Sequence, residues 1–221
     1  MKELRAALGK EMLLQWRTRT QLAAVFVFGA SALLLFSFAI GPNSEALRLH
    51  AAGFLWLALL LSSTLSLAES FQSEMEHRAF EGLLLLPVHP VALFYAKALS
   101  NWLQLVLLGV GLLPVMVVLY DAGTMRVPGL VGVILLGTAG LAAPGTLYAA
   151  MTSQARAQQT LLPLLLFPLV VPVLLAGVKA TSLLILGDPM EQVRAWALLL
   201  VAFDAIHWSL CGLLFGRVVE D

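Results

Sequence analysis

Charged residues are scarce in this sequence. Of its 221 residues, 12% are Asp, Glu, Lys or Arg and 60% are hydrophobic, whereas roughly 25% of residues are charged in an ordinary soluble domain. So much apolar surface cannot be hidden inside a water-soluble particle of this size, but a lipid bilayer solvates it. The 13 basic and 13 acidic residues balance, which excludes the basic face that a nucleic-acid-binding protein needs. The composition therefore predicts an integral membrane protein.

Cysteine and catalytic motifs are equally rare. The single cysteine, Cys211, excludes an intramolecular disulfide and lies in a hydrophobic run, where a small packed side chain is expected rather than a nucleophile. Gly9-Lys10 is followed by Glu11, so the phosphate-binding G-x-x-x-x-G-K-[ST] loop is absent. The sequence also has no H-E-x-x-H motif and no other close cluster of His, Cys and Glu with metal-ligand spacing. We therefore expect no catalytic residues and no metal site.

Long apolar runs are what the sequence does contain. About 20 consecutive apolar residues cross the hydrocarbon core as a helix, and only helices or closed barrels satisfy the backbone in lipid. The runs lack the two-residue alternation of barrel strands. The sequence therefore predicts an all-α integral membrane protein in which residues 1–221 form a single transmembrane domain. Its six spans are expected at about residues 21–41, 51–69, 93–119, 128–152, 158–179 and 194–216.

Residues 1–20, before the first span, have a different character. Leu4, Leu8, Met12 and Trp16 repeat every four residues, and basic residues occupy much of the remaining surface. This pattern is typical of an amphipathic helix that lies in the headgroup layer. A disordered basic tail is the alternative, but the tryptophan and the apolar stripe favour the interfacial helix.

The distribution of Lys and Arg predicts the orientation of the spans. With a cytoplasmic N-terminus, nine of the 13 basic residues lie inside and four outside. The inner set is Lys2, Arg5, Lys10, Arg17, Arg19, Arg78, Lys97, Arg156 and Arg217, and the outer set is Arg48, Arg126, Lys179 and Arg194. The N-terminal segment decides this result, because the remaining basic residues divide four against four. An even number of spans then places both termini, and the segment 70–90, in the cytoplasm.

Prolines and glycines mark the fifth and fourth spans. Pro163, Pro168 and Pro172 each remove a backbone hydrogen bond, so the fifth span should be kinked or broken. The fourth span is rich in glycine, and small residues permit close approach between helices. Both spans suit movement, and tight packing without movement is an equal alternative.

Asp204 and His207 form the ionisable pair of the sixth span. Their i, i+3 spacing places them on one helix face, where they could form a hydrogen bond. Ionisable groups at this depth cost about 2.5–3.5 kcal/mol on insertion and usually face the bundle interior. A packing contact is the first interpretation; a role in a conformational or cargo pathway, and haem or metal ligation by His207, are the alternatives. Asn101 and Gln104 in the third span are expected to form interhelical hydrogen bonds.

The sequence ESFQSEMEHRAFEGLLLLPVHP, residues 69–90, places acids between two apolar runs. Carboxylates are costly in lipid, yet the segment is too apolar for a free loop. A short helix over residues 71–81 puts Phe71 and Met75 on one side, and Gly82 and Pro87 end it. Such an amphipathic helix can dock into a groove on a second protein, or it can lie on the membrane surface.

Several motifs in and around this segment resemble those of a known family. The strings F-Q-S-E-x(6)-E-G-L-L-L-L-P (71–87) and K-A-L-S-N-W (97–102) resemble the first cytoplasmic segment of ABC-2-type permeases. Over its full length the chain is similar to the cytochrome c maturation haem exporter permease family, CcmB. The strings IGP (40–42), LLSSTLSLAE (60–69), LLGTAGLAAPG (135–145) and LLPLLLFPLVVPVLLAGV (161–178) all fit that family. The chain departs from it in having Phe71 with Glu74 where F-x-x-D is usual, and His77-Arg78 where members are more acidic.

The resemblance implies an ABC-2/type V exporter-like fold, with six spans, an N-terminal interfacial helix and a cytoplasmic coupling helix. It implies a non-enzymatic, multi-pass subunit of the bacterial inner membrane with both termini cytoplasmic. ATP would be hydrolysed by a separate ATP-binding subunit (CcmA-like). The interface that couples this subunit to the membrane would comprise Phe71, Gln72, Glu74, Met75, Arg78, Glu81 and Leu83.

The resemblance also implies partners and a process. A homodimer of this chain would associate with the ATP-binding subunit, a haem-handling membrane protein (CcmC-like), a small membrane subunit (CcmD-like) and a haem chaperone (CcmE-like). The process is haem export, or ATP-driven release of the haem-loaded chaperone, in cytochrome c biogenesis. No cofactor is expected on this chain itself, and haem could be its cargo. A permease of another ABC-2-type exporter, and a membrane scaffold without energy coupling, are the alternatives.

Overall fold

The computed structural model describes residues 9, 19–76, 90–123, 126–153 and 158–220, and these form helices and short connections without a strand. Each of the six long helices contains an apolar stretch that could cross a bilayer by its length and composition. The predicted all-α integral membrane fold is therefore confirmed. In chain order the helices are α2 (Arg19–Ile40), α3 (Ser44–Glu76), α5 (Pro90–Tyr120), α6 (Val127–Thr152), α7 (Gln158–Leu186) and α8 (Val193–Glu220).

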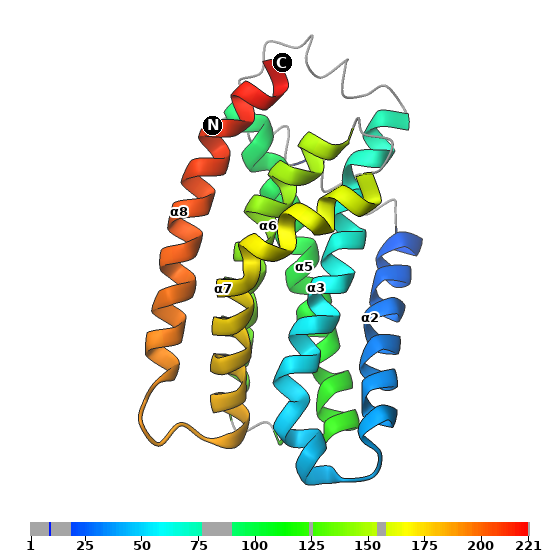
Figure 1. Cartoon of the computed structure of the whole chain (residues 1–221), viewed down its shortest axis with the longest axis vertical. Helices are drawn as coiled ribbons and strands as arrows, with labels where there is room; N and C mark the ends of the chain where they lie inside the picture. Colours follow the sequence, from blue (N-terminus) through cyan, green and yellow to red (C-terminus); the bar gives the residue numbers. More distant parts are fainter. Residues whose placement is uncertain (1–8, 10–18, 77–89, 124–125, 154–157, 221) are drawn as a thin grey trace.

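The helices run up and down along the long axis of the bundle, so that successive helices alternate in direction (Figure 1). The start of α2, the end of α3 and the end of α8 lie at the same end of the bundle, at the top of Figure 1. The first and last spans therefore begin and end on the side where α3 leaves the bundle, as an even number of spans requires. That this side is cytoplasmic stays a prediction.

Polar side chains bind backbone N–H groups at the start of two helices. The backbone N–H of Ala46 donates to Oδ1 of Asn43, 3.1 Å away, so α3 starts at Ser44 rather than near residue 51. At the start of α8, both carboxylate oxygens of Asp188 accept backbone N–H groups, from Gln192 at 2.8 Å and from Val193 at 2.9 Å. Because α3 starts earlier and α7 ends later than expected, the connections at this end of the bundle are shorter than the apolar runs predict.

The far end of α3 corrects the expectation of a separate short helix over residues 71–81. Residues 71–76 continue α3 without interruption, and 77–89 lie outside the described residues. No glycine or proline occurs between Phe54 and Glu76, so nothing in the sequence interrupts the helical hydrogen bonds there. The helix instead runs through the apolar span and into the polar segment.

α6 is the central helix of the bundle and packs against α3, α5, α7 and α8. Its glycines allow this: a β-carbon at Gly137, Gly140 or Gly145 would lie within 3 Å of a side chain from another helix. The prediction that this span permits close helix approach is confirmed. Two indoles also bind its backbone, since Trp102 of α5 donates to the carbonyl of Leu135 and Trp208 of α8 to that of Ala139.

Among the residues that the structure describes, Trp56 of α3 is the largest fully buried side chain, with 1% of its surface exposed. Its indole lies against Gly137 of α6 and Gly177 of α7, where a β-carbon would approach the ring to 2.1 and 2.6 Å. Its Nε1–H donates to Oγ1 of Thr181 on α7, 2.9 Å away. One side chain thus joins α3, α6 and α7, and its polar edge is satisfied in a region without water.

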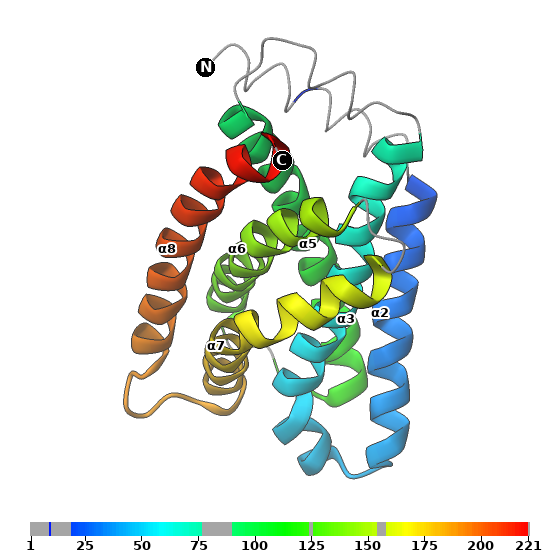
Figure 2. The same ribbon diagram turned by 45° about the horizontal axis from the view of Figure 1, so that its top comes forward.

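α7 is continuous but bent. Its first part runs across the bundle and its second part runs along it, as both views show (Figures 1 and 2). Pro163, Pro168 and Pro172 lie inside the helix, and each lacks the N–H that would continue the hydrogen-bond ladder. Of the two predicted outcomes, the kink is therefore the correct one and the break is not.

Candidate coupling site at one end of the bundle

The candidate site lies at the C-terminal end of α3, where the helix is longer than a bilayer requires. The helix has 33 residues, about 50 Å at 1.5 Å per residue, whereas the hydrocarbon core of a bilayer is about 30 Å thick. Its candidate span is Ser44–Ser70. Residues 71–76 therefore prolong the helix beyond the span, on the side where α5 begins and α8 ends (Figure 1).

The predicted coupling residues divide between this prolongation and the segment that follows it. Phe71, Gln72, Glu74 and Met75 occupy the last turns of α3. Arg78, Glu81 and Leu83 lie outside the described residues.

A polar contact joins the end of α3 to the start of α2. Nε2 of Gln21 donates to Oε2 of Glu69, 2.6 Å away. Both side chains are half-buried, and a hydrogen bond to a carboxylate oxygen is among the stronger kinds. The contact holds the peripheral helix α2 to α3 at the level where α3 leaves its span.

A second polar contact joins α3, α5 and α6. Oγ of Ser70 donates to Oδ1 of Asn101, 3.0 Å away, and Nδ2 of Asn101 donates to Oγ1 of Thr146 at 3.0 Å. Asn101 is 3% exposed and Thr146 is fully buried. The prediction that Asn101 bonds between helices is confirmed. Because Ser70 directly precedes the prolongation, this contact connects the candidate site to the centre of the bundle.

The sequence contained a signal for part of this contact. Ser62, Ser66 and Ser70 recur every four residues in an apolar run, which places them on one face of α3. The first two are buried and the third is half-buried. Polar residues on a buried face at this spacing indicate interhelical hydrogen bonding, but no local pattern identifies Thr146 as the distant partner.

Asp204 and His207 are half-buried residues of α8, and they do not form the hydrogen bond that their spacing would allow. Nδ1 of His207 lies 2.9 Å from the carbonyl oxygen of Phe203, one turn earlier, and because a carbonyl only accepts, this nitrogen carries the proton. The His207 ring also stacks on Phe203, with 3.7 Å between centroids. Oδ1 of Asp204 is buried without a hydrogen-bond partner and points at Gly140 of α6. The pair therefore turns in different directions, and no joint site forms.

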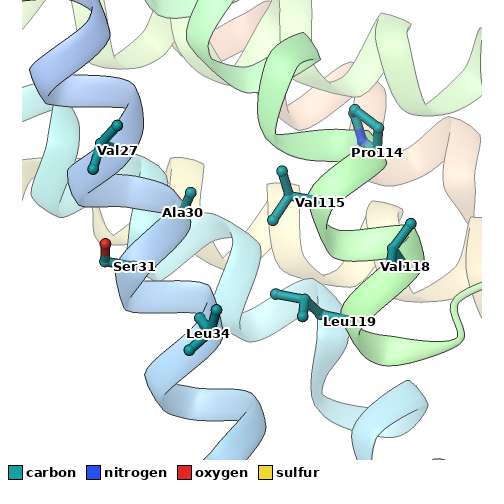
Figure 3. Close-up of a pocket in the computed structure, with 8 residues that line it drawn as sticks. All are labelled: Val27, Ala30, Ser31, Leu34, Pro114, Val115, Val118 and Leu119. Atoms are coloured by element: carbon teal, nitrogen blue, oxygen red, sulfur yellow. The ribbon is translucent and has the colours of Figure 1, made fainter.

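One hollow on the surface of the bundle has an almost entirely apolar lining. A surface groove of about 510 Å³ separates α2 from α5, where Ala30 and Leu34 face Val115 and Leu119 (Figure 3). Within the described ranges, no three His, Cys, Asp or Glu side chains lie close enough to hold a metal ion. At the end of α3, by contrast, hydrogen bonds between polar side chains link this helix to α2, to α5 and, through Asn101, to α6.

Comparison with known proteins identifies the family of this chain. The family model described as CcmB protein matches residues 2–220. The heme exporter protein B of Pseudomonas aeruginosa is 35% identical over 88% of this chain and 87% of its own length. The proteins of the same name from Rhodobacter capsulatus and Paracoccus denitrificans are 33% and 32% identical, over 80% and 92% of this chain and 81% and 94% of their own lengths. The chain is a member of the CcmB protein family.

Proposed function

We propose that this chain is the permease subunit of an ABC-type haem export system that serves cytochrome c biogenesis. Similarity over most of the chain to proteins named heme exporter protein B supports this role. A separate CcmA-like subunit hydrolyses ATP, and this chain contributes no catalytic residue. The observation that carries the coupling part of the proposal is the prolongation of α3 beyond its span, over residues 71–76.

The prolongation suits a subunit that receives mechanical work. α3 is one helix from Ser44 to Glu76, so a displacement of its protruding end moves the part inside the membrane as well. In the proposed scheme a homodimer of this chain lies in the bacterial inner membrane with the end of α3 in the cytoplasm. ATP-driven closure of the CcmA-like subunits pushes that end, and the bundle uses the movement for haem export or for release of a haem-loaded CcmE-like chaperone. CcmC-like and CcmD-like membrane subunits complete the assembly.

Charge reversal at the end of α3 tests the proposed interface. In the complete complex, Glu74→Lys should reduce the ATP-binding subunit recovered with this chain in mild detergent by roughly tenfold or more, because a misplaced charge in an interface costs several kcal/mol. The amount of this chain in the membrane should stay unchanged. Glu45→Lys is the matched control, because Glu45 is an exposed acid in the first turn of the same helix, at its other end. Equal recovery of the ATP-binding subunit with both variants would contradict the interface.

Two further measurements test whether the chain transmits energy from the ATP-binding subunit or only recruits partners. Phe71→Ala should lower haem delivery together with recovery of the ATP-binding subunit, since it removes an aromatic side chain from the protruding end of α3.

Complexes with an ATPase-inactive partner should fail to release the haem-loaded chaperone. Normal release from such complexes would show that the chain is a scaffold that recruits partners without transmitting energy.

A further inference from the structure

We propose that Asn101 is a positioning residue that passes the movement of the end of α3 to the central helix α6. This inference rests on the proposed function and identifies the route by which the movement enters the bundle. Ser70 is the last residue of the α3 span and directly precedes Phe71. Its hydroxyl donates to Asn101, and Asn101 donates to Thr146 of α6, each over 3.0 Å. A single amide therefore bridges the protruding helix to the middle of the molecule.

Burial favours the hydrogen bond between Asn101 and Thr146 over hydrogen bonds to water. Asn101 is 3% exposed and Thr146 is fully buried, so water cannot easily replace either partner of the inner hydrogen bond. An amide left without partners in an apolar interior is costly. The side chains of Ser70, Asn101 and Thr146 are therefore expected to stay together when α3 moves.

A steric contact at the same level reinforces the polar one. A β-carbon at Gly145 would lie 2.5 Å from Cδ1 and 3.6 Å from Cγ of Leu67. Leu67 is about one turn before Ser70, and Gly145 is next to Thr146. The leucine side chain thus occupies the space beside the glycine, and α3 and α6 pack closely at this level.

Glu69 and Ser70, at the end of the α3 span, form hydrogen bonds to different helices, and the bond from Ser70 to Asn101 leads to the centre of the bundle. The Gln21–Glu69 contact leads to α2, whose span is the least buried of the six at 17%. Thr146 belongs to α6, which packs against α5, α7 and α8 as well as α3. Movement that passes through Asn101 can therefore change the packing of most of the bundle, whereas movement that passes to α2 acts at its periphery.

Substitution of Asn101 in the complete complex separates transmission from assembly. With Asn101→Ala, the ATP-binding subunit should stay bound and hydrolyse ATP, whereas release of the haem-loaded chaperone should fall by about 2- to 30-fold, the range for substitutions along coupling networks. Ser100→Ala is the matched control, because Ser100 is 1% exposed and its hydroxyl has no hydrogen-bond partner. This control should release the chaperone at the unmodified rate. Ser70→Ala, which removes one hydrogen bond at a half-buried position, should reproduce the defect if Asn101→Ala fails to assemble.

A disulfide between α3 and α6 tests whether release requires these two helices to move together. Leu67→Cys and Gly145→Cys, made with Cys211→Ala to remove the native thiol, should link α3 to α6 covalently where their side chains meet. In the Asn101→Ala background, oxidation should restore release and reduction should abolish it again. Unmodified release in both Asn101→Ala and Ser70→Ala, or no rescue by the formed disulfide, would overturn the inference. If the unsubstituted chain fails to recover an ATP-binding subunit, the proposed function fails instead.

Discussion

The indole of Trp56 illustrates, at the scale of one residue, how this membrane protein replaces the hydrophobic effect with close packing. Between helices in lipid there is little hydrophobic driving force, so contacts depend on van der Waals packing and interhelical hydrogen bonds. Trp56 uses both, because it fills the space left by Gly137 and Gly177 and donates to Thr181. The glycine pattern predicted close approach in α6. It could not predict which side chain occupies the space, since Trp56 lies 81 residues from Gly137 (137 − 56).

Adding one methyl group at this position should be destabilising. In Gly137→Ala the new β-carbon would lie 2.1 Å from Cη2 of a fully buried indole, and overpacking a well-packed interior costs typically about 1–3 kcal/mol. Unfolding in detergent micelles should show a loss of this size. Gly132→Ala is the control on the same helix, because no atom lies within 4 Å of its added β-carbon and alanine favours a helix over glycine by roughly 0.5–1 kcal/mol. Equal stability of the two variants would show that Trp56 does not limit the packing.

At the scale of helices, the apolar runs located the spans but not all of their ends. α3 was expected as a span and a separate short helix, and it is one helix to Glu76, because the change from apolar to polar side chains does not interrupt backbone hydrogen bonds. The bend of α7 was expected from its prolines, since a missing N–H is a local property of the sequence. The direction of the bend depends on neighbours: Leu162 and Leu166, near the start of α7, are fully buried.

The bend of α7 can be tested because its second and third prolines are exposed. Pro168 and Pro172 are on the surface, so replacing both with alanine restores N–H donors without leaving a cavity. The helix should straighten, and the distance between spin labels at Thr160→Cys and Leu186→Cys should rise towards about 39 Å, the length of 26 helical steps. Leu164→Ala, at a residue that is 66% exposed, should leave the distance unchanged. An unchanged distance in the proline variant would mean that packing against the bundle alone maintains the bend.

At the scale of the whole molecule, the proposed function requires the end of α3 to face the cytoplasm. Met75 lies on that end, and Met190 lies in the connection between α7 and α8, at the opposite end and 76% exposed (Figure 1). Because the chain has a single native cysteine, which is buried, each position can be labelled alone in a Cys211→Ala background.

Labelling with a membrane-impermeant maleimide should therefore give opposite results for the two positions. Met75→Cys should react only in inside-out vesicles, and Met190→Cys only in intact cells from which the outer membrane has been removed. Reaction of Met75→Cys from the outside would place the end of α3 away from any cytoplasmic ATP-binding subunit. That result would refute the coupling scheme while leaving the fold unchanged.

The amino-acid sequence by itself determined that this chain crosses a membrane as a bundle of helices. Span length, hydropathy and the positions of proline and glycine are local properties, and lipid leaves the backbone no alternative to internal hydrogen bonding. Only the tertiary structure decided which buried groups meet. Ser70, Asn101 and Thr146 come together, whereas Asp204 and His207 do not bond although they lie on one helix. The reason is that such contacts depend on the rotation and depth of each helix relative to its neighbours, and packing across the whole bundle sets both.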